Sequence, residues 1–339
     1  MGKISSLLNL GSAYSNYARG KTVCGHAPLQ VWVEPTSVCN LRCPMCPNEA
    51  LPLEKKGFMD MALFRKIIDD ITGMVRNISI CHRGEPLLHR EICEMIRYAG
   101  SKGLAAGIHT NATVLDENLS RRLIESGLSR LSFSFDGFTK EDYGKIRVGA
   151  DFDAVLGNIV SFLKIKKASG STLPHVTLQV ISMSKGKNTE KKKAFLSRFE
   201  GLPLDRVYTK EAHNWAGAAG TVKRPGSRIH RCNSPWYSLV YHWDGSIHPC
   251  TLDYLGAYTI GDAGEDSALE AWNSAPMKTL RKEMAAGRLY ACSHCLQCSK
   301  LYEKKILGIS KRNILNEALF RLKWNISEGP VKDESTPGK

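Results

Sequence analysis

The chain has 339 residues, of which 42% are hydrophobic and 24% charged, with a formal net charge of +14. This composition is that of a globular protein, and the length suits one large domain with a smaller one. No apolar run approaches the ~20 residues that span a bilayer, and the N-terminus lacks a clear small-residue cleavage site. The sequence therefore disfavours a membrane-spanning or secreted protein and predicts a cytoplasmic one.

The positive charge is concentrated in residues 184–198 and 300–323. Basic surfaces attract nucleic acid, anionic lipid or phosphorylated substrates. Neither run has the interleaved aromatic residues of a single-strand-binding surface, so we do not expect nucleic acid as a partner. The charge favours an anionic substrate or carrier.

Residues 28–215 alternate between β-rich and helical patterns. Strands are predicted at 29–35, 77–82, 104–111, 130–137, 175–182 and 205–210, and helices at 61–72, 90–103, 116–127 and 153–168. Six βα-type units in series imply an α/β fold with a parallel sheet, and six rather than eight units favour a partial (β/α)6 TIM-like barrel. Reactive groups should gather at the carboxyl ends of its strands.

The pattern changes after residue 215. A Gly-rich stretch at 217–227 precedes a hairpin signal at 236–250, in which Asp244-Gly245 suits a tight turn. A helical pattern follows at 267–287, then a basic amphipathic pattern at 311–324 and a polar tail. We divide the chain into an N-terminal extension (1–27), the barrel (28–215), a small hairpin-plus-helix domain (216–305), and a basic helix with a disordered tail (306–339).

Eleven cysteines form two groups with three left over. Their odd number, tight clustering and lack of a secretion signal argue against disulfides, so metal ligation is expected. The first group is "CNLRCPMC", with Cys39, Cys43 and Cys46, and the second is Cys232, Cys250, Cys292, Cys295 and Cys298. The others, Cys24, Cys81 and Cys93, are expected to be small buried residues. Thiolates bind zinc or iron–sulfur clusters, but the first group lacks the nearby fourth ligand that a structural zinc site needs.

The C-x3-C-x2-C group after the first strand resembles the motif of the radical S-adenosylmethionine (SAM) superfamily. Segments after later strands also resemble that family: "HRGEP" (82–86), "HTNAT" (109–113), "SFSFDG" (132–137) and the start of 145–159. The resemblance implies a [4Fe–4S] cluster on Cys39, Cys43 and Cys46, whose open iron chelates SAM. It further implies reductive cleavage of SAM to a 5′-deoxyadenosyl radical that abstracts hydrogen from an unactivated carbon.

The resemblance also assigns roles around the cofactor. The segment Gly84-Glu85-Pro86 would receive the SAM amino group, with Glu85 as an acceptor. Ser134 and Asp136 would face the SAM carboxylate and ribose, and Arg147, at a helix start, would face the carboxylate. Further contacts are expected from Asn111 and Gln179.

Three positions depart from the family pattern. Arg83 replaces the first glycine of GGEP, and Ala112 replaces the glycine of TNG. Met45 stands where an aromatic residue commonly precedes the third cysteine. A thioether can still pack on the adenine.

The second cysteine group resembles the SPASM/twitch extension of radical SAM enzymes, which binds auxiliary [4Fe–4S] clusters. Full SPASM domains use seven cysteines for two clusters, whereas this group has five. We therefore predict one auxiliary cluster on Cys232, Cys250, Cys292 and Cys295, with Cys298 either replacing Cys295 or spare. From spacing alone, a structural zinc site is the alternative.

The leading hypothesis is a radical SAM enzyme that performs a net oxidation or cross-link, assisted by the auxiliary cluster and supplied by a reductant such as flavodoxin or ferredoxin. Candidate general bases are Asp253, after Cys250, and Glu211, after the last barrel strand. Only about 30 residues precede the first strand, which favours a small molecule such as a sugar or cyclitol over a peptide. The alternatives are a maturase of ribosomal peptides, a C–C bond-forming relative and, from another class, a zinc-binding nucleic-acid-binding protein.

Overall fold

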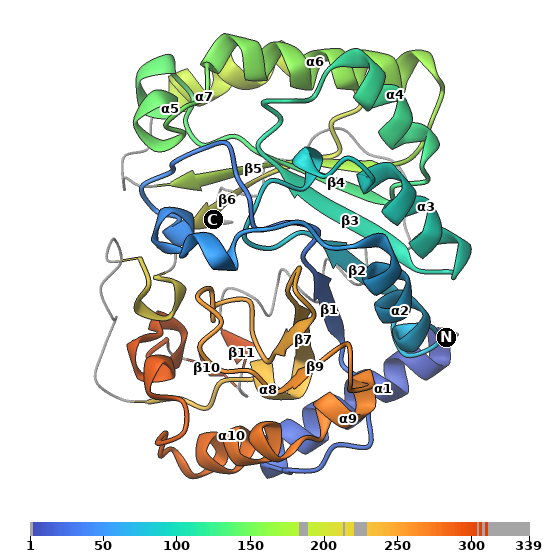
Figure 1. The fold of residues 1–339 in the computed structure, drawn as a ribbon. Coiled ribbons are helices and arrows are strands. Elements are labelled where there is room, and N and C mark those ends of the chain that lie inside the picture. Colours follow the sequence, from blue (N-terminus) through green and yellow to red (C-terminus); the bar gives the residue numbers. More distant parts are fainter. Residues whose placement is uncertain are drawn as a thin grey trace.

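The computed structural model describes residues 3–182, 189–212, 214–219, 229–303, 305–306 and 309–310. Six parallel strands pair in chain order, as Figure 1 shows, and each overlaps its predicted segment. They are β1 (Gln30–Val33), β2 (Asn77–Ile80), β3 (Ala105–Thr110), β4 (Arg130–Ser134), β5 (His175–Ser182) and β6 (Arg206–Glu211). The predicted α/β partial barrel is therefore confirmed.

Helices follow the strands and cover the outer face of the sheet (Figure 1). They are α2 (Met61–Ile71), α3 (Ile92–Ser101), α4 (Glu117–Glu125), α5 (Lys140–Ile146), α6 (Phe152–Ala168) and α7 (Thr189–Leu196). Aspartates start three of them, because the side chains of Asp60, Asp116 and Asp151 each accept a hydrogen bond from the first turn of the helix that follows. Alternate strand residues pack outward on these helices; the ring of Phe133, for example, meets Phe162 edge-on at 5.6 Å between centroids.

The region after β4 differs from the prediction. The sequence predicts Arg147 at a helix start, but Arg147 is the C-cap of α5, and α6 begins only at Phe152. Gly149 separates the two helices with a φ of +98°, a conformation that interrupts a right-handed helix. Arg147 therefore lies at the end of a short helix rather than at the beginning of the long one.

The C-terminal region continues the barrel sheet. β7 (Ser238–Tyr241) pairs in parallel with β1, β8 (Ser246–His248) pairs antiparallel with β7 through the predicted Asp244-Gly245 turn, and β9 (Gly261–Asp262) pairs with β8. The sheet order is β6-β5-β4-β3-β2-β1-β7-β8-β9. Backbone hydrogen bonds thus join the two regions that the sequence separates, while the boundaries at residues 27, 215 and 305 stay predictions.

Three further helices lie in the C-terminal region: α8 (Ser234–Tyr237), α9 (Ala268–Trp272) and α10 (Ala275–Ala286). The single helical pattern at 267–287 forms two helices because Ser274 caps α10 and Pro276 lies in its first turn. The N-terminal extension forms α1 (Lys3–Arg19), which lies beside this region (Figure 1). The ring of Tyr17 packs edge-on against Trp236 at 5.6 Å.

A short hairpin of β10 (Lys305–Ile306) and β11 (Ile309–Ser310) follows the last cysteines. The predicted basic pattern at 311–324, the polar tail, and most of the Gly-rich stretch, residues 220–228, lie outside the described residues. Among the helices that the structure does describe, none has the length and apolar character needed to cross a membrane.

Candidate cofactor and cluster sites

The loop that carries the first three cysteines follows β1 at the carboxyl edge of the sheet. Cys43 is buried, whereas Cys39 and Cys46 are partly exposed, and the backbone N–H of Cys46 donates to the Cys43 carbonyl at 2.9 Å. Burial, with a smaller contribution from the carboxylate of Glu85 and the other two thiols, raises the pKa of Cys39 to about 11. Burial likewise raises the pKa of Cys43. Three thiols gather in this loop, and Cys39 and Cys43 need a bound cation to hold them as thiolates, so this donor set fits a metal cluster.

Glu85 ties the end of β2 to the end of β3. Its carboxylate is buried and accepts hydrogen bonds from Thr110 Oγ1 at 2.7 Å, the Asn111 backbone N–H at 2.7 Å and the Leu87 N–H at 3.0 Å. Burial raises the pKa of Glu85, although these hydrogen bonds act in the opposite direction. A carboxylate has about four acceptor positions, so about one is left for an ammonium group.

Gly84 makes a close approach, but to protein backbone. A Cβ at Gly84 would lie 2.4 Å from the carbonyl oxygens of both Thr36 and Val38, which no side chain can tolerate. The next residue, Glu85, donates its N–H to the Val38 carbonyl at 2.9 Å. The glycine therefore lets the β2 segment dock on the chain that leads into the cysteine loop, and Pro86, buried, starts the 3-10 turn that follows.

Arg83, which departs from the family pattern, forms a buried ion pair with Glu34 just after β1. Its Nε and Nη2 donate to the two carboxylate oxygens at 2.8 and 2.7 Å, and the two side chains are 1% and 0% exposed. This bidentate geometry is specific to arginine. The substitution of the family's glycine is thus matched by an acidic partner on the neighbouring strand.

Asn111, at the end of β3, faces the first cysteine loop. Its Nδ2 donates to Asn40 Oδ1 at 3.0 Å, and its Oδ1 accepts from the Thr113 backbone N–H at 2.9 Å. Ala112 has a φ of +59°, the left-handed region that favours glycine. The backbone therefore keeps the conformation for which the family uses glycine, although the residue has changed.

Asp136 and Arg147 form a second buried ion pair. Asp136 Oδ2 lies 2.5 Å from Arg147 Nη2, and Asp136 Oδ1 accepts from the Ile181 backbone N–H. Arg147 Nη1 also points to the Cys43 sulfur at 3.8 Å. Asp136 therefore orients Arg147 beside the cysteine loop; its own contact with a ribose stays a prediction.

Ser134 and Gln179 are paired residues of β4 and β5. Gln179 is buried, and its Oε1 accepts from the Tyr208 hydroxyl at 2.6 Å. Met45 is buried within a small apolar cluster with Leu41 and Cys43. The contacts of these side chains with a cofactor stay predictions.

The second cysteine group gathers in one pocket. All five predicted cysteines line it, from three separate segments of the chain, namely Cys232, Cys250, Cys292, Cys295 and Cys298. Cys232 and Cys250 each lie 3.5 Å from the Ser234 hydroxyl. Burial, reinforced by Cys232 and Cys250, raises the pKa of Cys298 to about 12. Five thiols converging on one pocket provide enough donors for a four-iron cluster and one to spare.

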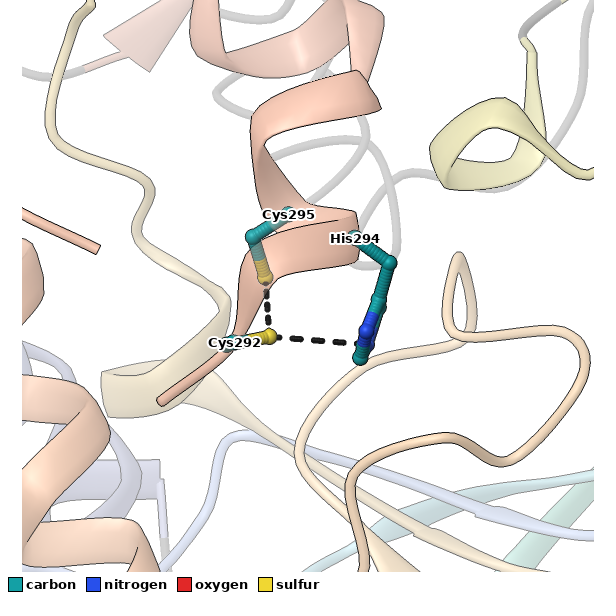
Figure 2. Close-up of side chains that lie close together, drawn as sticks. All are labelled: Cys292, His294 and Cys295. Carbon is teal, nitrogen blue, oxygen red and sulfur yellow. Dashed lines mark hydrogen bonds between the residues drawn. The ribbon is translucent and has the colours of Figure 1, made fainter. Parts of the chain in front are cut away.

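Figure 2 shows three of the side chains around this pocket. The sulfurs of Cys292 and Cys295 are 2.6 Å apart, and His294 Nε2 lies 3.5 Å from the Cys292 sulfur. These two hydrogen bonds lower the pKa of Cys292 to about 6, and the one from Cys295 contributes most. A thiol that ionises near neutral pH is a ready metal ligand.

The structure places the two proposed bases differently. Asp253 lines the pocket, but its carboxylate accepts from the backbone N–H groups of Ala257 and Tyr258 at 2.9 and 2.8 Å and faces His248 and His294 at 3.6 and 3.5 Å. Burial acts to raise its pKa, but these partners outweigh it and lower the pKa. A carboxylate held ionised in this way is a weak base, which argues against the predicted role. Glu211 ends β6, and its side chain lies outside the described residues.

Tyr254 and Trp215 carry contacts that the motifs did not indicate. The hydroxyl of buried Tyr254 lies 3.2 Å from the Cys46 sulfur, and the indole N–H of Trp215 donates to the Met45 carbonyl at 2.9 Å. Burial, with the neighbouring Cys46, raises the pKa of Tyr254 well above its ordinary value, so the phenol keeps its proton. Only the proximity of Tyr254 to Cys250 along the chain could have hinted at such a role.

Three histidines form a buried stack between the two regions. The ring of His82, after β2, stacks on His242 at 5.3 Å between centroids, and His242 stacks on His248 at 3.9 Å. Among the described residues, the Nε2 atoms of His82 and His242 have no hydrogen-bond partner. Burial, with a smaller contribution from nearby positive charge, lowers the pKa of His82 and of His242 well below the ordinary value, so both imidazoles are neutral.

Family models match both parts of the chain. The model of the Radical SAM superfamily matches residues 33–180, and the SPASM model, described as an iron–sulfur cluster-binding domain, matches residues 232–299. The chain is a radical SAM enzyme with a SPASM domain. These domains imply [4Fe–4S] clusters and SAM, and both cysteine groups fit such clusters by their donor chemistry.

Curated relatives are similar over part of their length only. Fe-coproporphyrin III synthase of Methanosarcina barkeri is 33% identical over 38% of this chain and 32% of its own length. The tungsten-containing aldehyde ferredoxin oxidoreductase cofactor-modifying protein of Pyrococcus furiosus is 31% identical over 44% of this chain and 43% of its own length. This radical SAM enzyme thus spans less than half of the length of these two relatives.

Solved structures of low identity share the fold. SuiB of Streptococcus suis, bound to its precursor peptide SuiA, has a TM-score of 0.64 at 14% identity and covers 91% of this chain and 77% of its own. The enzyme anSMEcpe with bound AdoMet has a TM-score of 0.55 at 17% identity and covers 88% of this chain and 97% of its own. The similarity extends through the barrel and the C-terminal region of this radical SAM enzyme.

Proposed function

We propose that the enzyme carries out a net oxidation or cross-link that begins with hydrogen abstraction from an unactivated carbon of its substrate. SAM cleaved at the cluster on Cys39, Cys43 and Cys46 would supply the abstracting radical. The observation that carries the proposal is the second pocket, on which five cysteines converge. The pocket lies in the region whose strands β7 to β9 continue the barrel sheet. A cluster with all its irons held by thiolates is suited to accept an electron, and such an acceptor turns a substrate radical into an oxidised product.

The described residues around the first cysteine loop support this role through orientation and charge. Arg147, held by Asp136, presents a guanidinium beside Cys43, where it would pair with a carboxylate. Glu85, anchored by three donors, retains an acceptor position for an ammonium. An amino acid moiety bound at this edge would meet a cation and an anion in fixed positions.

A small anionic molecule is the preferred substrate class, given the net charge of +14. A peptide is the second candidate. It is favoured by the similarity in fold to SuiB, which is bound to a precursor peptide in its structure. Competition assays with small anions and with basic or acidic peptides would separate the two classes.

The test is anaerobic purification and reconstitution, followed by iron and sulfide analysis and incubation with dithionite and SAM. We expect about eight iron and eight sulfide ions per chain, for two four-iron clusters, and formation of 5′-deoxyadenosine. A C39A/C43A/C46A variant should retain about half of the iron and form no 5′-deoxyadenosine, whereas C232A/C250A should still cleave SAM. A cluster-replete protein that forms none would refute the proposal, and stoichiometric zinc with salt-dependent nucleic-acid binding would favour the zinc alternative.

A further inference from the structure

The Tyr254 hydroxyl lies at a junction of three polar groups. It donates to the Arg83 carbonyl at 2.7 Å, accepts from Asn48 Nδ2 at 3.3 Å, and lies 3.2 Å from the Cys46 sulfur. Tyr254 is 1% exposed, so no solvent competes for these contacts. The ring is held by Trp215, which meets it edge-on at 4.9 Å between centroids.

The chemistry of the partners sets the direction of the contact with Cys46. The phenol has one hydrogen to give, and the Arg83 carbonyl and the Cys46 sulfur both lie within its reach. The Arg83 carbonyl also accepts a hydrogen bond from Asn48 Nδ2 at 3.0 Å. A cysteine that binds iron has lost its proton and can only accept. When the cluster is bound, the thiolate is a charged acceptor, whereas the Arg83 carbonyl is neutral and keeps its hydrogen bond from Asn48, so the phenol turns its hydrogen to the Cys46 sulfur.

The loop that carries Tyr254 also reaches the second cysteine pocket. Cys250 lines that pocket four residues earlier, and Asp253 lies 3.5 Å from His294, which contacts Cys292. Residues 214 and 215 also connect the two cysteine groups. Trp215 donates to the Met45 carbonyl in the first loop, and Asn214 donates to the Gln297 carbonyl in the second at 2.6 Å. Adjacent residues of one loop thus reach Cys46 directly and the second cysteine group through His294.

We propose that Tyr254 is a positioning residue for the SAM-binding cluster, which orients Cys46 and raises the reduction potential of the cluster by donating to its thiolate. Reduction adds negative charge to the cluster, and a hydrogen bond to a ligand sulfur stabilises that charge. This inference rests on the proposed assignment of Cys46 as a ligand. It adds a residue of the C-terminal region to the machinery that activates SAM.

The test is the variant Y254F in the reconstituted full chain, which keeps the ring and its contact with Trp215 but removes the hydroxyl. Redox titration measures the reduction potential of the SAM-binding cluster. That cluster is recognised because its electron paramagnetic resonance signal changes on addition of SAM. We expect reduction to become about tenfold less favourable, a fall of about 59 mV for one electron. The matched control is Y241F, which also removes a buried hydroxyl, one that has no hydrogen-bond partner among the described residues.

The outcomes separate this inference from the proposed function. If the wild type shows no SAM-responsive signal, the proposed function fails. If that signal is present but Y254F and Y241F have the same potential, the inference alone is wrong. Thermal unfolding of both variants is the second measurement, because a merely structural role for Tyr254 would lower the unfolding midpoint and leave the potential unchanged.

Discussion

Replacing Arg83 by methionine should destabilise the fold strongly, because the carboxylate of Glu34 would stay buried without its cation. The arginine supplies two hydrogen bonds of 2.8 and 2.7 Å to that carboxylate, and both side chains are at most 1% exposed. After the replacement, the donors to this carboxylate among the described residues would be the backbone N–H groups of residue 83 and Trp243, at 3.3 and 3.2 Å. Neither group carries a compensating charge.

The magnitude follows from this burial. Removing one partner of a buried ion pair costs about 3–5 kcal/mol, whereas removing both charges is often close to neutral. At roughly 2 °C per kcal/mol for a large domain, R83M should lower the thermal-unfolding midpoint by about 5–10 °C. The double variant R83M/E34Q should recover part of that loss, because its remaining buried group is uncharged.

The assay is differential scanning calorimetry of the anaerobically reconstituted wild type, both single variants and the double variant. The decisive quantity is whether the double variant is more stable than the sum of the two single changes in unfolding free energy predicts. A midpoint for R83M within about 2 °C of the wild type, or a double variant no more stable than R83M, would refute the account of Arg83 as a charge-compensating residue.

Three further results are expected. Lowering the pH from 7 to 5.5 should lower the unfolding midpoint, because the pKa values of His82 and His242 are well below 6.5 in the folded state, so these side chains bind protons in the unfolded chain first. The contribution of the two neutral histidines to stability is complete above pH 6.5 and is lost as the pH falls. An unfolding midpoint that does not change with pH would contradict this account. Of the five single Cys→Ala variants in the second pocket, one should keep the wild-type iron content and four should lose about half of it; loss in all five would mean that no thiol is spare. Replacing Ala112 by glycine should change the thermal-unfolding midpoint little, because relief of about 1–2 kcal/mol of left-handed strain offsets the loss of a buried methyl group. Valine at the same position should lower the midpoint by several degrees.

The local signals in the sequence were sufficient for the order and type of the barrel elements. Strand and helix patterns depend on neighbouring residues, and they predicted β1 to β6 and most of the covering helices. The C-x3-C-x2-C spacing likewise indicated a three-thiolate site, because its ligands lie within one loop. The helix predicted at 153–168 is confirmed as α6, but Arg147, which was expected at a helix start, ends α5, because Gly149 separates the two helices.

Contacts between distant segments could not be read from any local pattern. The pairing of β7 with β1 depends on which strand edge is free after the barrel has formed, and it brings the hairpin onto the barrel sheet. Tyr254 reaches Cys46 across 208 positions of the chain, and Glu34 meets Arg83 across 49. Asp253 is a candidate base in the sequence, but folding surrounds its carboxylate with two histidines and two N–H groups. The ligand types of this enzyme follow from residue identity and spacing, whereas the environment that tunes them arises only when the folded sheet brings remote side chains together.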